Sequence, residues 1–138
     1  MNKNNLLEIK KFYTKKNLNV YWASACEENQ FEAFQTEHKL QLTQQLKCFY
    51  EFSNGFSVSN PEMKIYSIEE LKLNSGLLEF CEINSNQKFG FDLSSTRVDD
   101  QWDIYHINSN TVITYTFASF LFNKVNKWLI KNKEFWSE

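Results

Sequence analysis

The chain has few of the residues that metal sites, disulfide frameworks and phosphate-binding loops require. Its 138 residues include two histidines, three cysteines, three glycines and one proline. Cys26, Cys48 and Cys81 are an odd number and lack the paired spacing of disulfides or zinc sites, so we expect reduced, mostly buried thiols. The glycines, at positions 55, 76 and 90, are too far apart for a phosphate-binding loop. The sequence therefore predicts no metal, no cofactor and no disulfide.

Long apolar runs are also missing. No stretch approaches the roughly 20 apolar residues that span a membrane. Lysines interrupt residues 1–16, where a secretory signal would need an unbroken apolar segment. We therefore expect a cytoplasmic protein without a membrane partner. The single proline and three glycines also argue against a disordered chain.

Neither sign of charge dominates, but the charges are unevenly distributed. The formal net charge is -2. Five lysines against one glutamate give residues 1–20 a charge of +4, whereas nine acidic and four basic side chains give residues 61–103 a charge of -5. Because phosphate groups are bound by clustered lysine and arginine, the acidic middle of the chain argues against a nucleic-acid partner. We interpret the N-terminal lysines as the solvated face of a helix.

Aromatic residues, by contrast, are plentiful. They make up 17% of the chain, with 13 Phe and 4 Trp, so we expect one aromatic core. A chain of this length is ordinary for one domain and can bury about two thirds of its unfolded surface. Helical patterns occur near both ends, and strand patterns lie between them. The sequence therefore predicts a single α+β domain over residues 1–138, in which helices flank a mainly antiparallel sheet.

Apolar residues three and four positions apart predict four helices. The expected helices lie within residues 5–16, 24–38, 40–56 and 117–131, the last of them capped by Thr116. Ser24 and Glu27 form the capping-box pattern at the start of the second helix. Thr43 is the expected N-cap of the third helix, and Asn54-Gly55 is its expected stop.

Alternating apolar residues predict that the middle of the chain is a sheet. The expected strands cover residues 20–22, 56–58, 63–66, 77–83, 88–93, 102–107 and 112–115. Polar turns join the last four strands into two hairpins. Ser67 and Glu70 predict one capped helical turn between strands, and Gly90 marks a bulge or a close backbone approach.

The candidate partner-binding site is an acidic stretch that contains one tryptophan. It comprises Asp92, Asp99, Asp100, Trp102 and Asp103. Negative charge around an aromatic anchor suits a basic protein surface. Other interpretations stay open. Asp99, Asp100 and Asp103 can bind a divalent cation or act as hydrated turn formers, and Trp102 can belong to the core.

No catalytic constellation stands out along the chain. An enzyme would require residues distant in sequence to meet, for example His106 with Cys81 or with an aspartate in a pocket. We place His106 on a strand, at the surface or in a cross-strand pair, and His38 at the end of a helix. The sequence therefore favours a binding protein without catalytic residues over an enzyme.

A series of short motifs runs in order through the chain. It comprises Phe31, Phe34, Gln35, Leu40, Leu42-Thr43, Leu46, Phe49-Tyr50, Asn54-Gly55, Ile65, Ser67 to Leu71, Phe91-Asp92, Ile104-Tyr105 and Ala118 to Leu121. Over residues 22–130 this order resembles the SUKH superfamily, which includes a fungal cell-wall-synthesis regulator and many bacterial toxin-immunity proteins. The helix at residues 5–16 is then an addition to the family's domain. Gln35, Thr43 and Phe56 depart from the pattern, in which Glu, Pro and a second Gly are common.

The resemblance implies a SUKH-like fold and a function in binding rather than catalysis. The resemblance thus implies a binding protein, most often one that neutralises a cognate bacterial toxin by direct contact. If that toxin is a nuclease with a basic cleft, an acidic surface would speed association and exclude the substrate. The alternative is an intracellular regulatory or scaffold protein of the same fold that binds a cellular partner.

Overall fold

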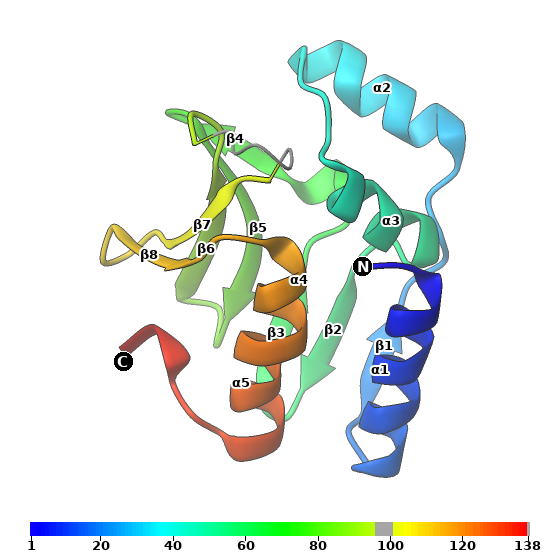
Figure 1. Cartoon of the computed structure of the whole chain (residues 1–138), viewed down its shortest axis with the longest axis vertical. Coiled ribbons are helices and arrows are strands. Elements are labelled where there is room, and N and C mark those ends of the chain that lie inside the picture. Colours follow the sequence, from blue (N-terminus) through cyan, green and yellow to red (C-terminus); the bar gives the residue numbers. More distant parts are fainter. Residues whose placement is uncertain (96–100, 138) are drawn as a thin grey trace.

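The computed structural model describes residues 1–95 and 101–137, and an antiparallel sheet lies at its centre (Figure 1). The helices are α1 (Lys3–Lys15), α2 (Glu28–His38), α3 (Gln44–Phe52), α4 (Phe117–Ser119) and α5 (Val125–Lys131). The short helical segments are η1 (Ile68–Glu70), η2 (Phe120–Lys124) and η3 (Phe135–Ser137). The strands are β1 (Val20–Trp22), β2 (Phe56–Ser59), β3 (Glu62–Ile65), β4 (Lys72–Asn74), β5 (Leu77–Ile83), β6 (Gln87–Asp92), β7 (Asp103–His106) and β8 (Thr111–Thr114). The predicted α+β class is confirmed.

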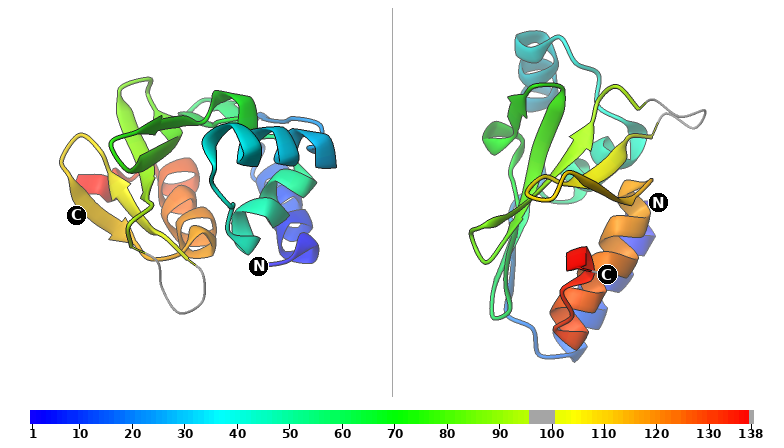
Figure 2. Two further views of the ribbon diagram at one scale, coloured as in Figure 1. Left: turned by 90° about the horizontal axis from the view of Figure 1, so that it is seen from above. Right: turned by 90° about the vertical axis from the view of Figure 1, so that its left-hand side faces the viewer.

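The strands follow the order β1-β2-β3-β5-β6-β7-β8, and neighbouring strands are antiparallel. One edge of β5 is shared, because β3 pairs with its C-terminal half and β4 with its N-terminal half. Both predicted hairpins, β5-β6 and β7-β8, are present. Helices α1, α3, α4 and α5 lie on one face of the sheet, and α2 lies at one end beside η1 (Figure 2).

The apolar stripes predicted from helical spacing are buried. They comprise Leu6, Ile9 and Tyr13 of α1, Phe31 and Phe34 of α2, Leu46, Phe49 and Tyr50 of α3, and Phe117, Phe120, Leu121, Val125 and Trp128 of the last helix. Most of these side chains are aromatic, and they belong to one continuous core. The predicted aromatic core is therefore confirmed.

The chain turns sharply from α3 into β2 at Gly55. Ser53 is already extended, and Gly55 has a φ of +92°, which favours glycine. A Cβ on Gly55 would lie 2.6 Å from the carbonyl oxygen of Ile65 and 3.0 Å from the amide nitrogen of Ser67. Of the predicted Asn54-Gly55 stop, Gly55 alone is left-handed. The corner needs glycine both for this conformation and for space.

The predicted start of the second helix is wrong. The carbonyl of Ser24 accepts a hydrogen bond from the amide of Asn54 (3.0 Å), close to the point where β1 pairs with β2. This bond holds Ser24 against the α3-β2 corner, so the helix begins later in the chain. Glu27 is the N-cap of α2 instead, and its amide donates to the side chain of Gln30 (2.8 Å).

A bulge in β5 places an extra aromatic residue in the core. The pairing of β5 with β6 shifts between Glu79 and Cys81, so Phe80 is the additional residue opposite Gly90. Phe80 is fully buried and stacks on Phe91, with ring centroids 4.1 Å apart. A Cβ on Gly90 would lie 3.3 Å from a carbonyl oxygen of β5. The predicted close approach at Gly90 is confirmed, and the bulge lies on the facing strand.

The segments α4, η2 and α5 form one continuous helix, as the spacing predicts for residues 117–131. The Thr116 hydroxyl accepts from the amide of Ser119 (3.0 Å), which confirms this N-cap. η2 is a π-helical turn, which spacing alone does not predict. The helix ends at Asn132, which is left-handed.

Gly55→Ala should destabilise the fold more than Gly76→Ala. Both glycines have positive φ values, +92° and +81°, so alanine is strained at either position. At Gly76 an added Cβ meets no atom within 4 Å, and we expect a loss of about 1 kcal/mol. At Gly55 the collision with backbone atoms adds to the strain, and we expect a loss of about 3 kcal/mol. Urea unfolding of the two variants measures the difference. Equal losses would contradict the role of the corner.

Candidate functional site

Two of the five predicted site residues lie side by side. Asp92 and Asp103 are direct partners across β6 and β7. A carboxylate oxygen of Asp92 accepts from the amide (3.0 Å) and the hydroxyl (2.7 Å) of Ser94. The amide of Asp103 donates to the hydroxyl of Ser95 (2.9 Å). Asp92 and Asp103 therefore begin and end the connection between β6 and β7.

Trp102, the aromatic member of the predicted site, belongs to the core. Its side chain is only 7% exposed, and its ring lies against Phe91 with centroids 5.6 Å apart. A buried ring cannot be the exposed anchor of a partner-binding patch, so the alternative interpretation of Trp102 is the right one. Asp99 and Asp100 lie outside the described residues. The described part of the predicted acidic surface is thus the Asp92 and Asp103 pair.

The sheet separates the histidine and cysteine that an active site would combine. Cys81 pairs with Phe89, and Phe89 pairs with His106, so a buried aromatic residue lies between them. His106 is 5% exposed, so its predicted cross-strand position is right and its predicted surface position is wrong. Its Nδ1 lies 2.6 Å from the Ser109 hydroxyl, and its Nε2 lies 2.6 Å from the Gln87 side-chain oxygen. Burial lowers the pKa of His106 and raises that of Cys81, so both are neutral at pH 7.

Within residues 1–95 and 101–137, no three His, Cys, Asp or Glu side chains are grouped so that they could hold a metal ion. Of the cation site considered at Asp99, Asp100 and Asp103, only Asp103 falls in these ranges. In the same part of the chain, no helix is both long enough and apolar enough to cross a membrane.

The elements at the two ends of the long axis (Figure 1) differ in the charged residues they carry. The end that contains α2 and η1 carries Glu28, Glu32, Glu37, Glu69 and Glu70, together with Lys39 at the C-cap of α2 and Lys64, which pairs with Glu70. We call it the acidic end. The opposite end contains the C-terminal turns of α1 and α5, with Lys10, Lys11, Lys15, Lys127 and Lys131. Such a separation orients a charged partner before contact.

Three hollows meet at η1 on the acidic end. They have volumes of about 410, 380 and 270 Å³ and lie beside α2, beside β4 and β5, and beside β1 and β2. Glu69 and Leu71 line the first two, and Lys64 and Glu70 line the last two. We take this region as the candidate functional site. We call the following residues the η1 surface: Gln30, Phe34, Glu37, Lys64, Ile68, Glu69, Glu70 and Leu71.

Local hydrogen bonds hold η1 in place. The amide of Ser67 donates to a carboxylate oxygen of Glu70 (3.0 Å), which confirms the predicted capping box. The side chain of Asn54 accepts from the amide of Ile68 (2.8 Å) and donates to Glu69 (3.0 Å). Asn54 therefore connects η1 to the α3-β2 corner.

Several carboxylates near η1 are neutralised by lysine. The ion pairs are Glu70 with Lys64 (2.5 Å), Glu79 with Lys72 (3.9 Å) and Glu82 with Lys88 (2.5 Å). Burial opposes ionisation of Glu70, but hydrogen bonds from Lys64 and Ser67 hold the pKa of its carboxyl below the usual value. The hydroxyl of Tyr66 donates to Glu79 (2.5 Å), and burial together with this bond raises the pKa of Tyr66. This part of the surface is electrically balanced.

Glu69 is different, because no ion pair among the described residues includes it. Its carboxylate accepts from two neutral side-chain amides, those of Asn54 (3.0 Å) and Gln30 (3.3 Å). Burial and the nearby Glu69 charge raise the pKa of Cys26 to about 12, so this thiol stays protonated. Two amides therefore orient a carboxylate whose charge no described cation neutralises.

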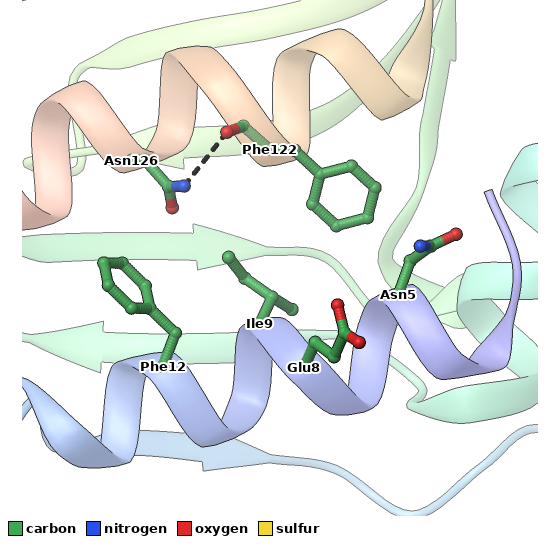
Figure 3. A pocket seen from close by; sticks show the side chains of 6 residues that line it. All are labelled: Asn5, Glu8, Ile9, Phe12, Phe122 and Asn126. Atoms are coloured by element: carbon green, nitrogen blue, oxygen red, sulfur yellow. Dashed lines mark hydrogen bonds between the residues drawn. The ribbon is translucent and has the colours of Figure 1, made fainter.

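A further groove lies between α1 and the facing helix of η2 and α5 (Figure 3). It has a volume of about 330 Å³, and the rings of Phe12 and Phe122 extend into the space between the helices. Asn126 is engaged within the fold, because it donates to the carbonyl of Phe122 (2.9 Å) and accepts from the hydroxyl of Tyr13 (2.5 Å). The groove is lined by apolar and polar side chains alike, since Asn5 and Glu8 face it together with Ile9.

No protein-family model matches the chain, and no curated protein matches it either. The chemistry of the η1 surface therefore rests on the residues that form it.

The sequence prediction does not include the η1 surface as a site. Asn54-Gly55 and the Ser67 and Glu70 pair carry a local signal, but that signal concerns a helix stop and a cap. Gln30 and Glu69 are 39 residues apart, and only tertiary packing brings them together. The sequence signal that could have indicated this site is the presence of acidic residues on a short capped turn.

The free energy of unfolding should fall between pH 7 and pH 5, and it should fall less in His106→Gln. Because burial lowers the pKa of His106 below its ordinary value of 6.5, the unfolded chain takes up this proton first. The contribution of neutral His106 to the free energy of unfolding is therefore complete above pH 6.5 and is lost as the pH drops below that value. Urea denaturation at both pH values measures the loss. A decline in His106→Gln equal to that of the unsubstituted protein would contradict the assignment.

Proposed function

We propose that this chain is a non-catalytic, SUKH-type binding protein that neutralises a cognate bacterial toxin by direct contact. The observation that carries the proposal is the group of carboxylates around the hollows at η1, of which Glu69 has no ion-pair partner among the described residues, while the lysine-bearing ends of α1 and α5 lie at the opposite end. Neutralising a toxin requires a preformed, complementary surface rather than a catalytic group. A nuclease toxin with a basic substrate cleft suits this surface.

The motifs behind the SUKH resemblance support the proposal, because several of them build the η1 surface. Phe31 and Phe34 are the buried face of α2. Asn54-Gly55 forms the corner against which η1 is held, through backbone contact and hydrogen bonds. Ser67 to Leu71 include η1 itself. Motifs that are weak individually in sequence thus converge on one region of the molecule.

Binding through the acidic end would act in two ways. Attraction between a carboxylate-rich surface and a basic cleft raises association rates by roughly 10- to 1,000-fold. Once bound, the protein would cover the cleft and repel the phosphates of a nucleic-acid substrate. The lysines of α1 and α5, at the far end, would turn the molecule so that η1 meets the partner first.

A regulatory or scaffold protein of the same fold is the second candidate. The groove between α1 and α5 favours it, because a scaffold needs a second surface for a second partner. The rings of Phe12 and Phe122 supply the apolar contacts that such a surface uses. This candidate predicts a cellular partner and no protection against a toxin.

Growth rescue tests the immunity function. Where the neighbouring gene encodes a toxin domain, that domain is expressed in a susceptible host with and without this chain. We expect growth only in the presence of the chain, together with a stable complex on copurification. If both proteins are folded and neither rescue nor a complex is observed, the immunity proposal is wrong and the regulatory candidate is favoured.

Charge reversal on α2 tests the orientation of binding. We expect Glu32→Lys with Glu37→Lys to slow association with the toxin about tenfold at low salt, and to reduce its dependence on salt. The matched control, Glu8→Lys with Glu51→Lys, changes the net charge equally but places it on α1 and α3. Stopped-flow measurements at two salt concentrations compare them. Equal slowing by both pairs would exclude the acidic end as the binding surface.

The aspartates of the partner-binding stretch predicted from the sequence are tested separately. Asp99→Asn with Asp100→Asn and Asp103→Asn removes three charges from that stretch. If partner binding and its salt dependence stay unchanged, that stretch is not part of the interface.

A further inference from the structure

We infer that the hollow between α2 and η1 is an anchor pocket for one lysine or arginine side chain of a protein partner. The inference deepens the proposed function and rests on it for the existence of a protein partner. It adds the position and the chemistry of one contact that the partner must make.

The floor of this pocket is apolar. Phe34, Ile68 and Leu71 are 6%, 2% and 7% exposed and line it together with Ala33. A pocket of about 410 Å³ is large enough to admit a long side chain. The methylene groups of lysine and arginine pack on such surfaces while the charged head stays at the rim.

The rim of the pocket is negatively charged. Glu69 is held in place by the side-chain amides of Asn54 and Gln30 and has no ion-pair partner among the described residues. Glu37 and His38 also line the pocket, and a carboxylate oxygen of Glu37 lies 3.9 Å from Nε2 of His38. A basic side chain would supply the charge that these carboxylates lack, and Glu69 is already oriented to accept its hydrogen bonds.

In the neighbouring hollow beside β4 and β5, two of the three lining carboxylates are already paired with a lysine, Glu70 with Lys64 and Glu82 with Lys88. Lys64 and Lys72 line it, and they already pair with Glu70 and Glu79. A cation entering there would meet two lysines, so charge favours the pocket beside α2. An apolar or acidic side chain would leave Glu69 without a counter-charge, so charge also selects the kind of residue that binds.

Small probes test the pocket without any toxin. The full chain, labelled with nitrogen-15, is titrated with the N-acetyl methylamides of lysine, arginine and norleucine. Norleucine has the lysine stem without the charge. We expect saturable shifts of the amide signals of α2 and η1 with lysine or arginine, at a Kd on the order of millimolar. Equal shifts with norleucine, or shifts confined to other elements, would overturn the inference.

Two variants locate the binding. Glu69→Gln keeps an oxygen that accepts from Asn54 and Gln30, and we expect it to weaken binding of the basic probes about fivefold. Ala33→Leu narrows the pocket without changing charge and should weaken binding as well. Glu51→Gln removes an exposed carboxylate of α3 outside the pocket and should leave the Kd unchanged. Undiminished binding in folded Glu69→Gln would overturn the inference.

The probe titration and the growth rescue can fail independently. Binding of the basic probes without rescue supports the pocket and assigns it to a partner other than a toxin. Rescue by Glu69→Gln with undiminished affinity for the toxin removes the pocket from the interface while leaving the immunity function intact.

Discussion

One close backbone approach, that of Gly55 to the segment between Ile65 and Ser67, places the main parts of the structure relative to one another. Because a side chain has no room there, the end of α3 can lie directly against the start of η1. Asn54 then bonds to the backbone and to a carboxylate of η1, and its own amide holds the chain that follows β1. One corner therefore joins a helix end, a sheet edge and the η1 surface.

The aromatic core is a second constraint, and it decides which residues are left for binding. Phe80 enters the core because β5 bulges, and it packs edge-on against Phe117 and Phe120 at centroid distances of 5.8 and 5.2 Å. These contacts attach the last helix to the sheet. The same core includes Trp102, whose burial separates it from the aspartates beside it in sequence. A tryptophan in an acidic stretch is thus explained by packing.

The elements that sequence reasoning predicts well are those defined by local rules. Helical spacing and caps identify α1, α3 and the helix over residues 117–131, and alternation identifies both hairpins. The predicted start of α2 is wrong. Ser24 matches the capping pattern, but its carbonyl accepts a hydrogen bond from the amide of Asn54 and the helix begins later in the chain. His106 fails in part for a similar reason, since alternation shows which face a residue occupies but not whether other elements cover that face.

By itself the sequence determined the α+β class, the order of most elements, the aromatic core and the division of the chain into basic and acidic blocks. These properties follow from the composition and from the spacing of apolar residues along the chain, and both depend on the sequence alone. Only the tertiary structure decided that the lysine-bearing ends of α1 and α5 lie at the same end of the molecule, and that Glu69 meets Gln30 without an ion pair to a described lysine. The physical reason is that electrostatic energy depends on distance and burial in space, and separation along the chain sets neither.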